Sequence, residues 1–455
     1  MYTEIKISEE TVASIWQQQL VTGLVTDDGK SLQVIHAGRA SSGEGCDFQD
    51  AVLILNGKRV EGDVEIHVKS SQWYSHRHHQ NQKYNKIVLH ITMWHDSQSP
   101  TLLQNGKAIP TVCLSAFISR PLNELIHQAG SHRHPLPSCP QATNYTCKES
   151  LNRILDKAGE KRFTDKAASI KKAILWEDPA QVLFQDIARA LGYTKNTRPF
   201  KELTHRLPLS FLCELKNETD TTMQALLLGT AGLLPSQRPK LQHRLIAELE
   251  VEDLEKSWQS INVDKALKES DWCFFRVRPD NFPTRRLIAL SHLLARYQNP
   301  GLLQGILNLV NEAPPETEHR WLENGLVVID QGYWSSHYDF GVSRNRTSAL
   351  LGQRRAAEIA VNIILPFAAA WGELAASPVL TKKATQIYHR YPKLENNELT
   401  RYMKQQLQLK ADYGLSARRQ QGLIHIFKVY CRHRNCAECP VNLQPRLRLG
   451  NTSIS

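Results

Sequence analysis

The chain of 455 residues contains no apolar run close to the roughly 20 residues that a membrane-spanning helix needs. Its first residues, MYTEIKISEE, are polar and acidic, which argues against a secretory signal. Nine cysteines are too few for a fold held together by disulfides, and neither an internal repeat nor a low-complexity tract is evident. We therefore expect a globular protein of the cytoplasm that does not associate with membranes.

What the chain does contain is an excess of positive charge. It has 56 lysines and arginines against 45 aspartates and glutamates, which gives a formal net charge of +11. A basic balance favours polyanionic partners. Nucleic acid is the expected partner, with DNA favoured over RNA, and the charge leaves the oligomeric state open.

The pattern of apolar residues changes along the chain. Residues 5–21 predict a helix with Ser8 as its N-cap, and strand-like runs follow between Leu32 and Phe117. Asn56-Gly57 predicts a tight hairpin turn, because both residues accept the positive φ of a type I′ turn. Helical spacing then recurs in six segments, which are 149–191, 221–233, 240–259, 283–297, 348–373 and 396–412.

These patterns predict an α/β protein with four parts. An N-terminal domain over 1–130 combines a mixed sheet with a flanking helix, and a His- and Pro-rich linker covers 131–148. A mainly helical region over 149–419 follows, and 420–455 forms a cysteine cluster and tail.

The second strand of the predicted hairpin carries four ionisable side chains at alternate positions, Asp63, Glu65, His67 and Lys69. Alternate residues of a strand share one face. Counted from the turn, Asp47 on the first strand comes close to Glu65. Two carboxylates can hold a hard cation such as Mg²⁺ or Mn²⁺, with His67 and Lys69 assisting. The alternative is a solvated polar face, and His76, His78 and His79 taken alone are interpreted as surface residues.

This arrangement resembles the PD-(D/E)XK nucleases, in which an Asp begins one strand and an acid-x-Lys follows on the next. Asp47 and Glu65 match the two acids, and an N-terminal helix acid is matched by Glu9 or Glu10. The resemblance implies a restriction-endonuclease-like fold and metal-dependent cleavage of phosphodiester bonds. Cys46 stands where the motif has Pro, and His67 stands where it has Lys.

These departures leave alternatives open. Lys69 lies about 6.6 Å further along the strand than the lysine of the motif. Either His67 replaces that lysine or Lys69 reaches back, and Asp63 with Glu65 is an alternative acidic pair.

Several longer stretches resemble a bacterial family described only as a domain of unknown function, DUF2851. They are GCDF with Ala51, GDVEIHVKSSQW, the strand from Tyr84 to Ile91, ALLLGTAGLL, RVRPDNFPTRR, LGQRRAAEIAVNIILPF and YCRHRNCAECP. Together they cover nearly the full length. The family implies no established activity.

Two basic stretches are candidate nucleic-acid contacts. Arg276, Arg278 and Arg286 surround Pro279 and Pro283 in RVRPDNFPTRR, where proline would hold the arginines in a defined spread. Arg354 and Arg355 follow Gly352 in the densest basic stretch of the helical part. In both stretches the alternative is structural, with the arginines paired to acids or lying on a solvated helix face.

The C-terminal CRHRNCAEC places Cys431, Cys436 and Cys439 within nine residues. Three thiolates at this spacing predict Zn²⁺ or an iron–sulfur cluster. The fourth ligand stays open between His433 or His425 and Cys273 or another distant cysteine. Cys139 and Cys147 are interpreted as an incidental pair.

The sequence thus predicts a metal-dependent nuclease, or a nuclease-like nucleic-acid processing protein. The alternative is a binding or scaffold protein that keeps the nuclease-like fold without turnover. The intact acids and the positive charge favour the first, and the replaced Pro and shifted Lys favour the second.

Overall fold

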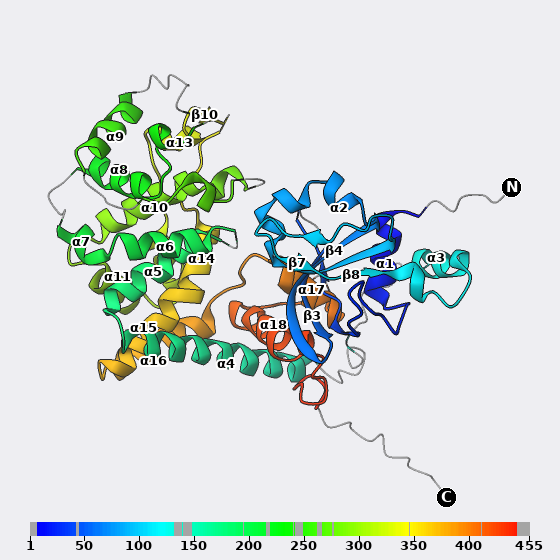
Figure 1. Ribbon diagram of the computed structural model, residues 1–455. Helices are drawn as coiled ribbons and strands as arrows, with labels where there is room; N and C mark the ends of the chain where they lie inside the picture. The colour runs from blue at the N-terminus through cyan, green and yellow to red at the C-terminus, as the bar shows by residue number, and fades with distance from the viewer. Residues whose placement is uncertain are drawn as a thin grey trace, which may run out of the picture. The chain divides into compact units, whose positions relative to one another are not determined.

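The structure is a computed structural model (Figure 1). It describes residues 7–41, 45–131, 139, 148–193, 195–214, 219–239, 241, 249–261, 266–274, 277–344, 346–410 and 412–443. The chain forms two compact units. The first comprises residues 1–159, 396–414 and 422–455, and the second comprises 160–395 and 415–421. The first unit therefore combines the predicted N-terminal domain with segments from the C-terminal part of the chain.

The first unit contains a mixed sheet in the order β1-β3-β4-β5-β8. Its strands are β1 (Leu32–His36), β3 (Phe48–Leu55), β4 (Lys58–Lys69), β5 (Ile87–Trp94) and β8 (Thr111–Cys113), and the short β2 (Arg39–Ala40) also pairs with β3. β1, β3 and β4 run antiparallel, whereas β4, β5 and β8 are parallel. The predicted α/β class with an N-terminal mixed sheet is confirmed.

The β3–β4 hairpin turns at Asn56 and Gly57, as predicted, with φ of 47° and 77°. Near the turn Leu55 pairs with Lys58, but Phe48 pairs with Val64 after a register shift between Phe48 and Ala51. The extra residue forms a β-bulge at Asp50, whose φ is 60°.

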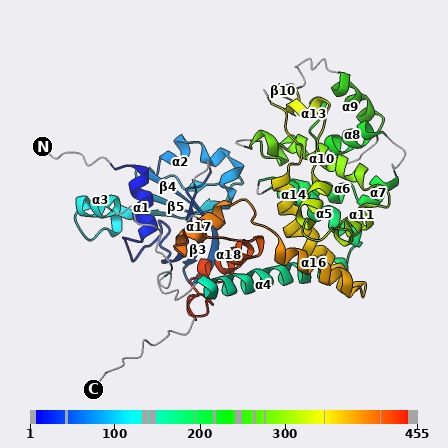
Figure 2. The same cartoon turned by 180° about the vertical axis from the view of Figure 1, so that it is seen from behind.

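One face of the sheet is covered by α1 (Glu9–Gln18), and α3 (Leu122–Ser131) packs beside α1, as Figure 2 shows. Ser8 caps α1 as predicted, accepting a hydrogen bond from the Thr11 amide at 3.2 Å. Buried Val12, Ile15 and Trp16 of α1 join one hydrophobic core with Val64 and Ile66 of β4. The apolar alternation of β4 therefore points toward α1.

The opposite face carries the polar alternation of β4. It is covered by the connection from β4 to β5, which contains α2 (Gln72–Ser75), η1 (His78–Gln80) and η2 (Gln82–Lys86). A small hairpin of β6 (Thr101–Leu102) and β7 (Ala108–Ile109) lies on this side too. Trp73 and Tyr84 are buried there, so this face is enclosed within the unit.

The C-terminal elements of the first unit are α17 (Glu398–Gln406), the end of α18 (Ala417–Val429) and η8 (Cys431–His433). η8 packs on β1 and β3, and the rings of His36 and Phe427 meet edge to face at 5.8 Å. These contacts explain why the end of the chain folds with the N-terminal sheet.

The second unit is mainly helical. After α4 (Lys148–Ile174), which contributes to both units, it contains α5 (Pro179–Leu191), α6 (Thr197–Arg206), α7 (Leu209–Glu214), α8 (Asp220–Thr230), α9 (Leu249–Gln259), α10 (Pro283–Arg296), α11 (Leu302–Asn311), α12 (Glu318–Leu326), α13 (Tyr333–Ser336), α14 (Gln353–Ile359), α15 (Leu365–Leu374) and α16 (Pro378–Arg390). The short strands β9 (His337–Asp339) and β10 (Val342–Ser343) pair with each other. The helix predicted over 149–191 is interrupted before Pro179, which begins α5.

The most apolar helix of this unit runs through α14, the π-helical turn η7 (Ala360–Ile364) and α15. Within the described residues, it is the one helix whose length and composition suit a membrane span, and 72% of its most apolar window is buried inside the protein. Its residues belong to the hydrophobic core of the second unit. The π-turn ends two residues before Pro366, and such turns accommodate a missing backbone donor.

Candidate active site

Asp47 and Glu65 meet on the polar face of the sheet. Because Phe48 pairs with Val64, the adjoining Asp47 lies opposite Glu65. The Asp47 amide donates to Glu65 Oε2 at 3.2 Å, and the Ile66 amide donates to Asp47 Oδ2 at 2.8 Å. Glu65 is only 4% exposed. Glu9, the first residue of α1, accepts a hydrogen bond from Gln72 Nε2 at 3.1 Å and raises the pKa of both acids by its charge.

The electrostatics of this pair are those of crowded, buried acids. Burial raises the pKa of Asp47 to about 6. Burial and then the charge of Asp47 raise the pKa of Glu65 to about 9. Among the described residues, neither carboxylate forms an ion pair with lysine or arginine; the basic groups near Glu65 Oε1 are His78 Nε2 at 3.4 Å and His67 Nε2 at 3.9 Å. A divalent cation would supply the positive charge that these acids lack.

Four histidines lie beside the acids. His67 follows Glu65 on the same face of β4, His90 comes from β5, and the connection between the strands supplies His76 and His78. His67 Nε2 lies 3.2 Å from His78 Nε2, and His67 Nδ1 lies 2.9 Å from His90 Nε2. Ligand atoms of His67, His76 and His78 all lie within 4.8 Å of one another.

The imidazoles of His67, His78 and His90 are uncharged at neutral pH. Burial, followed by the other imidazoles, lowers the pKa of His67 to about 2 and that of His78 to about 4. Burial also lowers the pKa of His90 to about 3. A neutral imidazole offers a nitrogen lone pair, which is the form that binds metal ions. The sequence analysis interpreted both His76 and His78 as surface residues. His76 is exposed as expected, whereas His78 is buried, and the density of histidine in YSHRHH was an available signal.

A family model described as a protein of unknown function, DUF2851, matches residues 9–398. The chain belongs to the DUF2851 family. The match includes both acids and all four histidines of the site. No curated protein and no solved structure matched the chain.

The other ionisable residues of β4 in this DUF2851 protein lie apart from the pair. Lys69 is exposed at the end of the strand, where its amide donates to Gln72 Oε1 at 2.7 Å. Asp63 Oδ1 accepts a hydrogen bond from the Asp50 amide at 3.1 Å, so this carboxylate holds the β-bulge. The geometry brings together Asp47, Glu65 and His67 and leaves Lys69 at the edge.

The C-terminal cysteines lie in and after η8. Cys431 is half-buried, Cys439 is buried and Cys436 is exposed. Burial, and then the nearby thiols of Cys439, Cys139 and Cys436, raise the pKa of Cys431 above the usual thiol range. Cys139 acts on Cys439 as well, and its amide donates to the Gln406 carbonyl of α17 at 3.0 Å. Cys139, which the sequence analysis interpreted as incidental, therefore lies near two of the three predicted ligands, Cys431 and Cys439.

Two other residues that the sequence offered as the fourth ligand, His433 and Cys273, make different contacts. His433 Nδ1 hydrogen-bonds with the guanidinium of Arg59, and Cys273 belongs to the second unit, where its amide donates to Asn196 Oδ1 at 2.8 Å. Cys147 lies outside the described residues.

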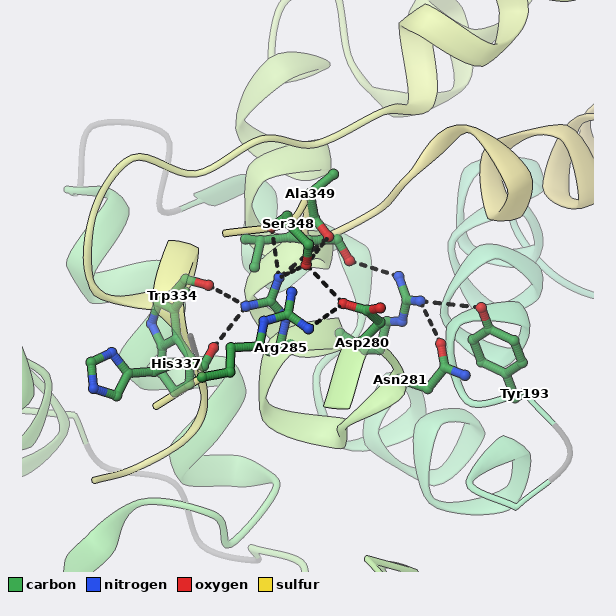
Figure 3. Close-up of polar contacts among 11 residues, drawn as sticks. Tyr193, Asp280, Asn281, Arg285, Trp334, His337, Ser348 and Ala349 are labelled. Carbon is green, nitrogen blue, oxygen red and sulfur yellow. Dashed lines mark hydrogen bonds and ion pairs between the residues drawn. The ribbon is translucent and has the colours of Figure 1, made fainter. Parts of the chain in front are cut away.

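The predicted nucleic-acid arginines divide into buried and exposed groups. Arg286 is 3% exposed, and its guanidinium donates to the Leu350 carbonyl, Asn281 and Tyr193. Its neighbour Arg285 is surrounded by backbone carbonyls in the same way (Figure 3). These donors hold the chain segments of the second unit together.

The remaining predicted arginines have different settings. Arg355 lies over the Tyr193 ring at 3.7 Å and pairs with Glu358. Arg278 is exposed, and Arg354 is 80% exposed at its side chain and pairs with Glu395 at 2.9 Å. Arg276 lies outside the described residues. Their role in binding nucleic acid stays a prediction, and Arg278 and Arg354 are the ones placed to reach a ligand.

Proposed function

We propose that this DUF2851 protein is a metal-dependent nuclease that hydrolyses phosphodiester bonds, with DNA favoured over RNA as substrate. The observation that carries the proposal is the convergence of Asp47 and Glu65 on one buried face, without a lysine or arginine partner among the described residues. Their raised pKa values fit a site made for a cation. The formal charge of +11 supports a polyanionic substrate.

The residues have distinct roles in this proposal. Asp47 and Glu65 would hold Mg²⁺ or Mn²⁺, which activates water and screens the phosphate charge. His67 stands two residues after Glu65, where the PD-(D/E)XK motif has lysine, and its neutral imidazole keeps a lone pair at the site. Lys69, exposed at the strand end, is placed to attract the substrate backbone.

The test measures cleavage of supercoiled plasmid, single-stranded DNA and RNA with Mg²⁺ or Mn²⁺. Asp47→Asn and Glu65→Gln should each reduce cleavage at least a hundredfold. Glu61→Gln is the matched control, because Glu61 lies on the same strand but is exposed and pairs with Arg59 and Arg432. Equal activity of all three variants would contradict the proposal.

The second candidate function is binding without turnover. It is favoured by the replacement of the motif lysine by His67 and the position of Lys69 at the edge of the site. Under this alternative the wild type shifts DNA on a gel but cuts none of the substrates with either metal.

We also propose that the C-terminal cysteines hold Zn²⁺ or an iron–sulfur cluster in a structural role, with Cys139 as fourth ligand beside Cys431, Cys436 and Cys439. The support is that the Cys139 thiol lies close enough to Cys431 and Cys439 to help raise the pKa of both, beside the larger effect of burial. An absorption spectrum of fresh protein distinguishes the two, since an iron–sulfur cluster is brown and zinc is colourless. The cytoplasmic location without membrane association stays a prediction.

A further inference from the structure

We propose that His67, His76 and His78, together with Glu65, form a binding site for a transition-metal ion such as Zn²⁺, distinct from a Mg²⁺ or Mn²⁺ site at Asp47. The proposal goes beyond the nuclease assignment and shares Glu65 and His67 with it. It rests on the positions of the donor atoms.

The spacing of the donors suits one ion. Two ligands at zinc distances of about 2.05 Å in a tetrahedron lie about 3.3 Å apart. His67 Nε2 and His78 Nε2 are 3.2 Å apart, and His78 Nε2 and Glu65 Oε1 are 3.4 Å apart. The third distance, from His67 Nε2 to Glu65 Oε1, is 3.9 Å. Small side-chain movements would bring all three atoms around one centre.

The donor atoms are also held in place from behind. His67 Nδ1 contacts His90 Nε2 at 2.9 Å, and His90 Nδ1 contacts Thr101 Oγ1 at 3.2 Å. Thr101 Oγ1 in turn contacts Thr111 Oγ1 at 2.8 Å. Metal-binding histidines are oriented in this way through their second ring nitrogen. This series of hydrogen bonds holds the His67 ring with Nε2 directed toward His78.

His78 is fixed by packing. Its ring lies 4.0 Å from the Tyr84 ring and 5.3 Å from the Trp73 ring, and both aromatic residues are buried. His76 differs because it is exposed, yet its ligand nitrogen lies within 4.8 Å of those of His67 and His78. A third imidazole on the solvent side completes the site while leaving access from outside.

The ligand types decide the class of ion. Imidazole nitrogens suit Zn²⁺, Cu²⁺, Fe²⁺ and Ni²⁺, whereas Mg²⁺ and Mn²⁺ prefer oxygen. The Glu65 oxygens face different ways, with Oε2 toward the Asp47 amide and Oε1 toward His78. A transition-metal ion at the histidines and a hard ion at Asp47 would therefore share this carboxylate, as in two-metal sites.

A hydrogen bond between His67 and His78 is the competing explanation, because one N–H···N contact would account for their 3.2 Å separation without a metal. It does not account for the approach of a His76 nitrogen to both imidazoles, or for the position of Glu65 Oε1 at 3.4 Å from His78 Nε2. The two explanations differ in what His76→Ala does, since that residue takes no part in the hydrogen bond.

The experiment titrates Co²⁺ and Zn²⁺ into full-length protein stripped of weakly bound metal, and follows Co²⁺ absorption and the number of ions bound. His76→Ala should weaken binding at least tenfold, and His67→Gln should remove one ion per chain. His79→Ala is the matched control, since His79 is a neighbouring histidine whose ring contacts Tyr74 instead. Exchange protection of β4 shows whether each variant folds.

Co²⁺ bound by the C-terminal thiolates absorbs equally in the wild type and in His76→Ala, so subtracting the two spectra removes its contribution. Its sulfur-to-cobalt charge-transfer bands also lie apart from those of histidine-bound Co²⁺. Identical titrations of the wild type, His76→Ala and His67→Gln would overturn the proposal. Asp47→Asn separates it from the nuclease assignment, because this variant should lose cleavage and keep the histidine-bound ion. A wild type that binds the ion but cuts nothing would contradict the nuclease assignment alone.

Discussion

Glu65→Gln should stabilise the metal-free protein at neutral pH, although it removes a residue of the candidate site. In the unfolded chain this carboxyl ionises near the ordinary glutamate pKa of 4.5, whereas in the folded protein burial holds the pKa at about 9. The folded state keeps the proton that the unfolded state releases, so stability falls as the pH rises from 4.5 toward 9. Glutamine has the same shape and cannot ionise.

The expected size follows from the interval between the unfolded pKa and the working pH. From 4.5 to pH 7 the wild type loses about 3 kcal/mol, at 1.36 kcal/mol for each pH unit. The variant should therefore be more stable by about 3 kcal/mol at pH 7 and equal to the wild type near pH 4. Mn²⁺ should reverse the order, because it stabilises only the protein that binds it.

Hydrogen–deuterium exchange of the β4 and β5 amides in rising urea is the suitable assay. The chain has two compact units and nine tryptophans, so total fluorescence would mix their transitions. Measurements in EDTA at pH 4 and pH 7 give the difference directly. If Glu65→Gln were no more stable than the wild type at pH 7, the carboxyl would not be held protonated, and the cation argument would lose its basis.

Three further predictions concern other parts of the chain. Gly62→Ala should cost about 1–3 kcal/mol in urea unfolding, because its Cβ would lie 2.3 Å from Val88 Cγ1; unchanged stability would show that β5 moves aside. Arg286→Leu should lower stability by about 2–4 kcal/mol, since it leaves buried acceptors unpaired. Full stability with weaker DNA binding would instead place Arg286 at the nucleic-acid surface. Cys139→Ser should reduce zinc or iron per chain in elemental analysis, and Cys113→Ser should not; equal losses would remove Cys139 from the ligand set.

The periodic features of the N-terminal region were predictable from the sequence. The N-cap at Ser8, the turn at Asn56-Gly57 and the separation of polar and apolar residues on β4 depend on neighbouring residues, and the structure confirms all three. Local propensity and alternation contain this information because a strand has a fixed period of two.

The features that the sequence did not predict depend on distant parts of the chain. In the sequence His78 is typical of a surface residue. In the structure the connection between β4 and β5 folds back over β4 and places the His78 ring against Tyr84. Cys139 has no evident partner in the sequence until α17 and η8 lie beside it. Such contacts arise between segments far apart in sequence, and no periodic pattern records them.

The β-bulge at Asp50 shows how one residue determines whether the acids meet. In the register set by the turn, Ala51 pairs with Gly62, so Asp47 would lie opposite Ile66 and share its apolar face. The bulge shifts the register by one, which turns Asp47 to the face of Glu65. A non-glycine residue at φ of 60° is strained, and here the strain is offset by the Arg39–Asp50 ion pair at 2.5 Å and by the bond to Asp63. A sheet needed only for packing would gain nothing from this bulge, because the bulge places the Asp47 carboxylate beside that of Glu65, where the two acids repel each other. The conformation of Asp50 is therefore best understood as part of the site.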